Sequence, residues 1–211
     1  GTHTCPAPNY VHTIAIDGVN DFYSTEKFAA GSGYSAYATW DATYLYVGME
    51  GAAVNSGSTS QWWLIYIGGT GGTTTGQGYI AGGVGQQPVL PFSAKYHVRW
   101  KADNAYTNAQ TWNGTAWADA TWDFTNDVFK GTLAPNDDFV EMRIPLADIG
   151  SPTAVQLHMS MLDEAAGATE LTWAPFPATS FTVNTLDPDY TKYYEFDLAA
   201  KLAPWGFTPK P

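Results

Sequence analysis

The sequence has little positive charge and almost no cysteine. Only 9 of its 211 residues are Lys or Arg, against 20 Asp or Glu, which gives a net charge of −11. Nucleic-acid binding needs clustered basic side chains for the phosphate backbone, and the absence of such clusters argues against it. The same shortage argues against binding to an anionic membrane surface. The single cysteine, Cys5, permits no internal disulfide.

Long apolar runs are missing as well. None approaches the ~20 residues of a membrane-spanning helix, so we do not expect the chain to cross a membrane. It starts without Met or a signal peptide, and we expect a mature or trimmed form of a secreted or cell-surface protein. Near that start, Cys5 could be a lipid attachment point or a free thiol, but an inert tail residue is the commoner case.

The familiar catalytic motifs are also absent. The sequence contains no GxSxG elbow, no HExxH, no phosphate loop and no Cys–His nucleophile pair. A glycoside hydrolase needs two carboxylates at a defined separation, which no sequence pattern can reveal. We therefore expect a protein that is not an enzyme.

The chain is rich in the residues of strands and turns. It has 9 Trp, 13 Tyr and 21 Gly, and aromatic and β-branched residues favour a pleated surface. The strongest segment is 38–52, where a turn at 41–43 joins two strands, and Asn113-Gly114 predicts a hairpin within 109–119. The predicted strands are 13–16, 34–40, 44–49, a central strand from Gln61 (QWWLIYIGG), 95–101, 139–144, 155–161, 171–173 and 193–197.

This spacing predicts one all-β domain, a two-sheet antiparallel β-sandwich of the immunoglobulin-like or jelly-roll-like kind. We expect long loops, including a glycine-rich loop at 68–88, and at most short helices, around 24–30 and 146–149. The domain is expected to span 14–200, between an N-terminal tail (1–13) and a C-terminal tail (201–211).

Alternation along the middle strands separates an apolar row from a mixed row of aromatic and polar side chains. We expect the apolar rows to pack between the sheets and the mixed rows to form one concave outer face. Aromatic plates with a few hydrogen-bonding groups are suited to a sugar. The alternatives are a solvated polar face, or a face covered by the glycine-rich loop. The candidate ligand-binding residues are Trp62, Tyr66, His97, Arg99, Glu141, Arg143, His158 and Ser160.

Four segments, IDGVNDFY, ATWDATYLYV, FVEMRIPLADIG and LDPDYTKYYEFDL, occur in this order. Together they resemble family-nine carbohydrate-binding modules and their DOMON-like relatives over residues 14–198. The resemblance implies a two-sheet antiparallel sandwich. The group includes sugar-binding domains attached to xylanases and glucodextranase-like proteins, and also haem-binding domains.

The sugar-binding members hold their ligand between two Trp residues, and this sequence departs from that pattern. The loop before the QWWLIYIGG strand, 57–60, has no Trp, and the nearest are Trp62 and Trp63. The family's sugar-binding Glu and Arg fall on Leu64 and His97, and its second Trp falls on Leu186 or a neighbour. The usual sugar clamp is therefore absent from its usual places.

Metal and haem chemistry have weaker candidates. His97 and His158, with Glu141 between them, form a possible transition-metal site. Met49 and His158 are the available axial ligands for a haem. Structural calcium is a possible cofactor, because the acidic loop clusters supply oxygen ligands, although turn-forming Asp residues are the commoner explanation of such clusters. These clusters are residues 136–138, 163–164 and 187–189.

These observations predict a non-catalytic extracellular module that binds an oligo- or polysaccharide by stacking and hydrogen bonds. One alternative is a structural module that docks on a partner protein through its aromatic faces. The second alternative is a haem or metal carrier.

Overall fold

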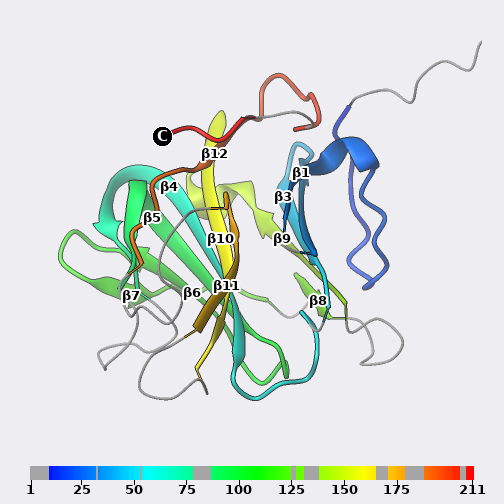
Figure 1. Ribbon diagram of the computed structural model, residues 1–211. Coiled ribbons are helices and arrows are strands. Elements are labelled where there is room, and N and C mark those ends of the chain that lie inside the picture. The colour runs from blue at the N-terminus through cyan, green and yellow to red at the C-terminus, as the bar shows by residue number, and fades with distance from the viewer. Residues whose placement is uncertain are drawn as a thin grey trace, which may run out of the picture.

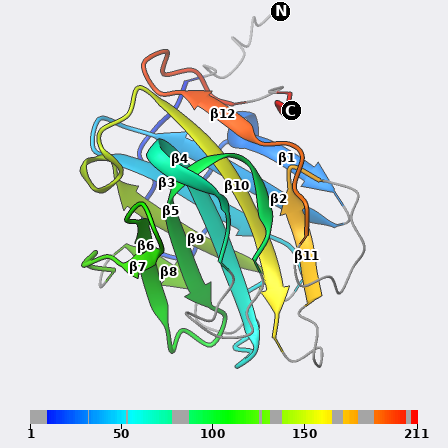
Figure 2. The ribbon, with the colours of Figure 1, turned by 90° about the vertical axis from the view of Figure 1, so that its left-hand side faces the viewer.

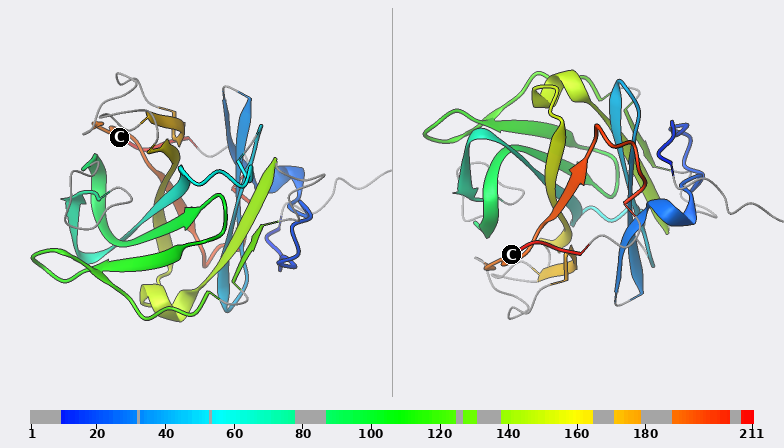
Figure 3. Two further views of the ribbon diagram at one scale, coloured as in Figure 1. Left: turned by 90° about the horizontal axis from the view of Figure 1, so that it is seen from below. Right: turned by 90° about the horizontal axis from the view of Figure 1, so that it is seen from above.

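The computed structural model describes residues 10–31, 33–52, 54–77, 87–124, 127–130, 138–164, 171–178, 188–204 and 208–211. Two antiparallel sheets face each other across one apolar core (Figure 1). Seen end-on in Figure 3, the sheets form two layers, and the N-terminal segment lies outside one of them. The predicted all-β, two-sheet sandwich is confirmed.

The first sheet has five strands in the order β1-β2-β3-β9-β8. A single 3-10 turn, η1 (Ser24–Glu26), precedes it, in place of the longer helical turn expected around 24–30. Its strands are β1 (Lys27–Gly31), β2 (Tyr34–Trp40), β3 (Tyr44–Glu50), β8 (Val128–Lys130) and β9 (Phe139–Pro145).

The second sheet has seven strands in the order β11-β10-β4-β5-β6-β7, and β12 pairs with β10 beyond the end of β11. The 3-10 turn η2 (Leu146–Ile149) connects the first sheet to this one. Its strands are β4 (Gln61–Thr75), β5 (Val89–Lys101), β6 (Thr107–Trp112), β7 (Trp117–Asp119), β10 (Ala154–Asp163), β11 (Leu171–Phe176) and β12 (Tyr194–Asp197).

The turn between β2 and β3 forms as the sequence predicts. One carboxylate oxygen of Asp41 accepts hydrogen bonds from the backbone N–H groups of Thr43 (2.7 Å) and Tyr44 (2.8 Å). An Asp commonly closes a turn in this way. The turn directs Leu45, Val47 and Met49 inward, because alternate side chains of a strand face the same side.

The core lies between the sheets and consists of the predicted apolar rows. Trp63, Ile65 and Ile67 of β4 are fully buried in it. Alternating residues of the strands beside β4 and of the opposite sheet complete it, namely Val98, Trp100, Val140, Met142, Ile144, Val155, Leu157, Met159 and Met161. Alternation therefore identified the inward residues of all four middle strands.

Two predicted segments differ in the structure. Residues 13–16 form no strand: the N–H of Ala15 donates to a carboxylate oxygen of Asp21 (3.3 Å), and its carbonyl accepts from the N–H of Asp17 in a tight turn (3.1 Å). The predicted loop 68–88 begins as strand, since β4 continues to Thr75, and residues 78–86 lie outside the described residues.

The second half of β4 and the first half of β5 arch over the outer face of their own sheet (Figure 2). The two strands approach each other too closely for most side chains: a Cβ at Gly72 would lie 2.3 Å from the carbonyl oxygen of Ala94. Glycine is therefore required for this arch.

The described parts of both predicted tails contact the sandwich. Tyr10 forms a β-bridge with Leu202, and the N–H of Val11 donates to the carbonyl of Lys201 at 3.2 Å. The domain limits at 14 and 200 stay a prediction, and Cys5 lies outside the described residues. In the described part of the chain, no helix has the length and apolar character that a bilayer crossing requires.

Candidate functional site

Six of the eight predicted site residues share the outer face of the seven-stranded sheet. His158, Tyr66 and His97 are direct cross-strand partners on β10, β4 and β5. The same row continues through Gln110 on β6 to Asp119 on β7. Direct cross-strand partners have side chains on the same face of a sheet. The neighbouring positions of this face hold Trp62, Arg99 and Ser160.

The expectation of one shared face is wrong for Glu141 and Arg143. Both lie on β9, which pairs with β3 in the five-stranded sheet. Alternation along a strand defines its two faces, but it does not say which sheet the strand joins. The core separates these two side chains from the other six. Whether any of the eight binds a ligand stays a prediction.

The six side chains on the outer face are covered, and for Tyr66 the alternative of a cover by the glycine-rich loop is confirmed, because its hydroxyl donates to the carbonyl of Gln77 (2.6 Å). Trp62 is 5% exposed, and the other five are at most 1% exposed. A second layer of rings covers them: Tyr106 packs edge-on against Trp62 (5.6 Å between ring centroids), and Trp117 against Tyr66 (6.3 Å). Tyr190 stacks on His158 at 4.0 Å. Tyr106 and Trp117 of this second layer reach solvent, whereas Tyr190 is itself buried.

The two buried histidines of this face have different environments. His97 stacks on Tyr66 at 4.1 Å, and its Nδ1 lies 3.1 Å from the carbonyl of Ile65, which only accepts, so Nδ1 carries the proton. The ring nitrogens of His158 have no hydrogen-bond partner among the described residues. Burial lowers the pKa of His158 to about 3, so its ring is neutral at ordinary pH.

A polar network reaches the edge of this face along β6 and β7. Arg99 Nη2 donates to Asn108 Oδ1 at 2.8 Å. The amide nitrogens of Asn108 and Gln110 donate to Asp119 Oδ1, both at 3.1 Å. Hydrogen bonds from Gln110 and Asn108 lower the pKa of Asp119, whereas burial lowers the pKa of Arg99. Asp119 is exposed, so the network connects the buried Arg99 to solvent.

We call this edge the rim: Tyr106, Asn108, Gln110, Trp112, Trp117 and Asp119. Tyr106 is 41% exposed, and the guanidinium of Arg99 lies 5.9 Å from its ring centroid. Trp112 and Trp117 pack edge-on at 5.8 Å across the hairpin and are half-buried.

The rim was not identified from the sequence as a candidate site. If the alternation of side chains had been followed outward from the Asn113-Gly114 turn, it would have placed most of the rim residues on one face. Tyr190 gave no signal, because it lies in no predicted strand.

Glu141 and Arg143 have structural partners on the other side of the molecule. One oxygen of the fully buried Glu141 accepts the backbone N–H groups of Asp17 (2.8 Å) and Gly18 (2.7 Å). Burial raises the pKa of Glu141 to about 7 against these hydrogen bonds, and the charges of Asp21 and Asp17 add to the increase. Arg143 Nε donates to Asp127 at 2.7 Å.

The metal and haem combinations considered from the sequence are ruled out by placement. Glu141 is in the sheet opposite His97 and His158, with the core between, so the three cannot bind one metal ion. Met49 points into the core and His158 away from it, so they cannot ligate one iron. Across the described residues, no group of three or more His, Cys, Asp or Glu is arranged to hold a metal ion.

Calcium at the acidic loops stays a prediction. Asn136, Asp137 and Asp187 lie outside the described residues. Of the pair at the end of β10, Glu164 lies 3.9 Å from the Lys101 ammonium, which supplies an ion-pair partner for its carboxylate.

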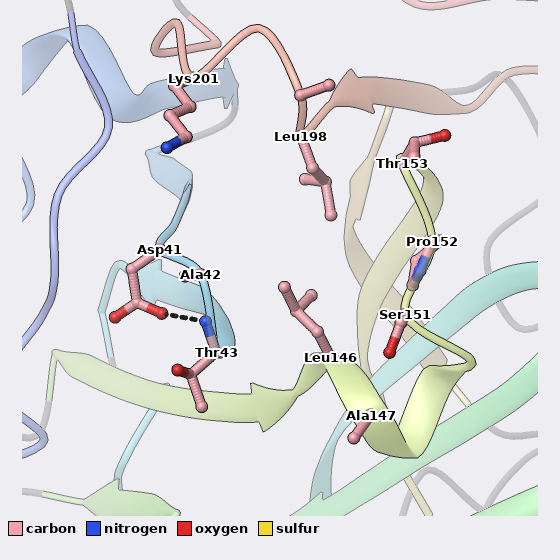
Figure 4. Close-up of a pocket in the computed structure, with 11 residues that line it drawn as sticks. Asp41, Ala42, Thr43, Leu146, Ala147, Ser151, Pro152, Thr153, Leu198 and Lys201 are labelled. Atoms are coloured by element: carbon pink, nitrogen blue, oxygen red, sulfur yellow. Dashed lines mark hydrogen bonds between the residues drawn. The ribbon is translucent and has the colours of Figure 1, made fainter.

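A pocket of about 410 Å³ lies at one end of the sandwich (Figure 4). The turn between β2 and β3 forms one wall, and η2 with the segment leading to β10 forms the opposite wall. Residues that follow β12, among them Leu198 and Lys201, close it. No prediction from the sequence fell on this pocket.

The chain matches no protein-family model, no curated protein and no solved structure.

Proposed function

We propose that this protein is a non-catalytic, extracellular carbohydrate-binding module that uses the outer face of its seven-stranded sheet. The observation that carries the proposal is the rim, where one exposed ring, two half-buried rings and a shared network of amide and carboxylate groups follow one another along β6 and β7. The likeness to family-nine carbohydrate-binding modules, which rests on the four sequence segments, agrees with this function.

The rim offers both interactions that sugars use. The apolar C–H faces of a sugar ring stack on aromatic rings, here Tyr106 and Trp117, while its hydroxyls bond to polar groups such as Asp119 and Asn108. The oxygens of Asp119 only accept at neutral pH, and the hydrogen bonds that lower its pKa keep it ionised. The first-layer residues Trp62, Tyr66 and His97 then support the rim from below instead of contacting the sugar.

The length of the rim favours an oligosaccharide over a monosaccharide. Tyr106 and Trp112 are six residues apart, and at the rise per residue of a β-strand their Cα atoms are separated by about 20 Å. A chain of several sugar units lying along β6 would contact both ends. Binding involves no bond breaking, so the protein would return its ligand unchanged.

The test is a titration with soluble cello-, xylo- and laminari-oligosaccharides followed by Trp fluorescence. We expect a fluorescence change with at least one series, and about fivefold weaker binding in Trp117→Ala, because one stacked ring contributes about 1 kcal/mol. Tyr106→Ala should behave likewise. Tyr10→Ala removes another exposed ring away from the rim and serves as the matched control.

Two results would count against the proposal. One is the absence of any response to all three series. The other is binding that Trp117→Ala and Tyr106→Ala leave unchanged, which would place the sugar elsewhere. Trp62→Ala is a poorer test, because Trp62 is buried and its loss threatens the fold itself.

A further inference from the structure

We propose that the pocket in Figure 4 binds a small organic carboxylate with a short apolar chain, held by the ammonium group of Lys201. The pocket measures about 410 Å³, which is within the usual range for small-molecule sites. It lies at the end of the sandwich, away from the rim, so the inference does not depend on carbohydrate binding.

The walls of the pocket are fixed to one another by main-chain hydrogen bonds. The N–H of Leu146 donates to the carbonyl of Thr43 (2.8 Å), which joins η2 to the β2–β3 turn. The N–H of Leu198 donates to the carbonyl of Thr153 (2.9 Å), and Trp40 Nε1 donates to the carbonyl of Leu198 (3.1 Å). Three chain segments therefore form a preorganised cavity, which lowers the entropic cost of binding.

Two residues of the pocket have an unusual backbone. Ser151 (φ 49°) and Lys201 (φ 53°) both adopt the left-handed conformation, which is unfavourable for residues with a side chain. The N–H of Val11 holds Lys201 in place through its carbonyl. Strained backbone persists where the surrounding structure enforces it, and it concentrates at ligand sites. In this protein the two left-handed residues, Ser151 and Lys201, both line this pocket.

The charged residues of the pocket lining are Asp41 and the exposed Lys201. Lys201 forms no ion pair with any described residue, and its ammonium group extends toward the Asp41–Thr43 turn (Figure 4). The Asp41 carboxylate is already used, because Tyr46 and Thr13 donate to one oxygen and two turn amides to the other. These four hydrogen bonds occupy its acceptor positions. Lys201 is thus the charged group left for a ligand.

The rest of the lining selects an apolar chain. Leu146 and Leu198 point toward each other across the pocket (Figure 4), and Ala147 and Pro152 extend this surface. A hydrocarbon chain buried here gains about 0.8 kcal/mol per methylene by transfer data. Asp41 beside the site and the net charge of −11 oppose any anion, and they oppose a multiply charged anion most. One carboxylate with a short hydrocarbon chain satisfies both parts of the pocket.

The experiment is a titration of ¹⁵N-labelled protein with hexanoate, with hexanol and hexylammonium as matched probes. We expect hexanoate to shift the backbone amide signals of Leu146, Ser151 and Leu198, and to bind about tenfold more tightly than hexanol, as one charge-assisted hydrogen bond provides. Hexylammonium should bind more weakly than hexanol.

Variants separate the charge from the shape of the pocket. Lys201→Met should reduce hexanoate binding to the level of hexanol, and Lys201→Arg should retain the preference. Ala147→Trp, which adds a large ring to the pocket lining without changing charge, should weaken the binding of both. Lys192→Met removes an exposed lysine elsewhere and should change nothing. The dispersion of each variant's spectrum reports whether it is folded.

Three outcomes would overturn the proposal. They are the absence of hexanoate-dependent shifts at the pocket amides, equal affinity for hexanoate and hexanol in the wild type, and full hexanoate affinity in folded Lys201→Met. The rim and the pocket share no residue. The response of Trp fluorescence to sugars, and its loss in Trp117→Ala, are therefore independent of whether the pocket binds hexanoate.

Discussion

The buried carboxylate of Glu141 accepts a hydrogen bond from the backbone N–H of Gly18, which lies 123 residues earlier in the chain. This contact fastens the N-terminal segment to the outer face of the five-stranded sheet. It also places a carboxylate where burial and two nearby aspartates raise its pKa to about 7.

The Glu141 contact predicts a pH dependence of stability. Because the pKa is higher in the folded protein than in the unfolded chain, the folded state binds the proton more tightly. The contribution of Glu141 to the free energy of unfolding is therefore greatest below the unfolded pKa and falls as the pH rises through 7. Glu141→Gln keeps an acceptor oxygen for both amides and cannot ionise, so it should lack this loss.

Urea denaturation of both proteins at about pH 5 and about pH 8 measures the effect, with a differential loss on the order of 1 kcal/mol. Other groups titrate over this interval, but they do so equally in both proteins. An identical pH dependence in wild type and Glu141→Gln would show that Glu141 ionises normally.

His158 provides a second prediction. Its ring nitrogens have no hydrogen-bond partner among the described residues, so an apolar ring of similar shape loses no hydrogen bond there. We expect His158→Phe to be as stable as wild type at neutral pH, and more stable under acid conditions. The unfolded chain protonates His158 at a pKa near 6.5 whereas the folded protein does not, which destabilises the wild type as the pH falls.

Thermal unfolding of wild type and His158→Phe at about pH 5 and about pH 7 is the appropriate measurement. In wild-type NMR spectra, the His158 ring signals should not titrate over this interval. A protonation step of His158 within it would contradict the neutral, buried ring.

The rim network should contribute to stability through Asn108. Asn108→Ala removes the acceptor of Arg99 Nη2 and one donor to Asp119, which should cost about 1–3 kcal/mol, because Arg99 is buried and charged. The urea midpoint reports this change, and Thr121→Ala, at an exposed position, is the control. Equal midpoints for the two variants would mean that the network adds no stability.

The arch of β4 and β5 depends on Gly72. In Gly72→Ala the new methyl group would meet the main chain of Ala94 at 2.3 Å, so the strands must separate, at a cost of about 1–3 kcal/mol. Gly31→Ala is a matched control, because a Cβ at Gly31 meets nothing within 4 Å. Denaturant midpoints compare them. Equal stability of the two alanine variants would show that the arch tolerates a side chain at Gly72.

The sequence predicted the architecture because the signals for strands are local. Alternation between Gln61 and Ile67 was enough to separate Trp63 from Trp62, and the Asn113-Gly114 turn was enough to locate a hairpin. Pairing between distant strands has no such signal. Nothing in the β9 sequence indicates that β9 joins β3 rather than β10, and the error on Glu141 follows from this.

The sequence also contained no indication of how deeply the side chains of the outer face are buried. A strand pattern shows which side of the sheet Tyr66 and His158 occupy, but not what lies above them. Trp117 and Tyr190 cover these rings from segments 51 and 32 positions away in the chain, respectively. Such contacts depend on how connecting segments fold back, which side-chain periodicity does not describe.

The pairing of Val11 with Lys201 determines how the protein responds to tension. If both ends of the described chain are pulled apart, the pairing of Lys210 with Tyr193 is loaded at the C-terminal end. The Val11–Lys201 hydrogen bond and the Tyr10–Leu202 bridge are loaded next, before the strands of either sheet. Their rupture would release the backbone of Lys201 and remove the cation from its pocket while the sandwich stays folded. A stretched molecule would therefore lose the proposed carboxylate site before its sandwich unfolds.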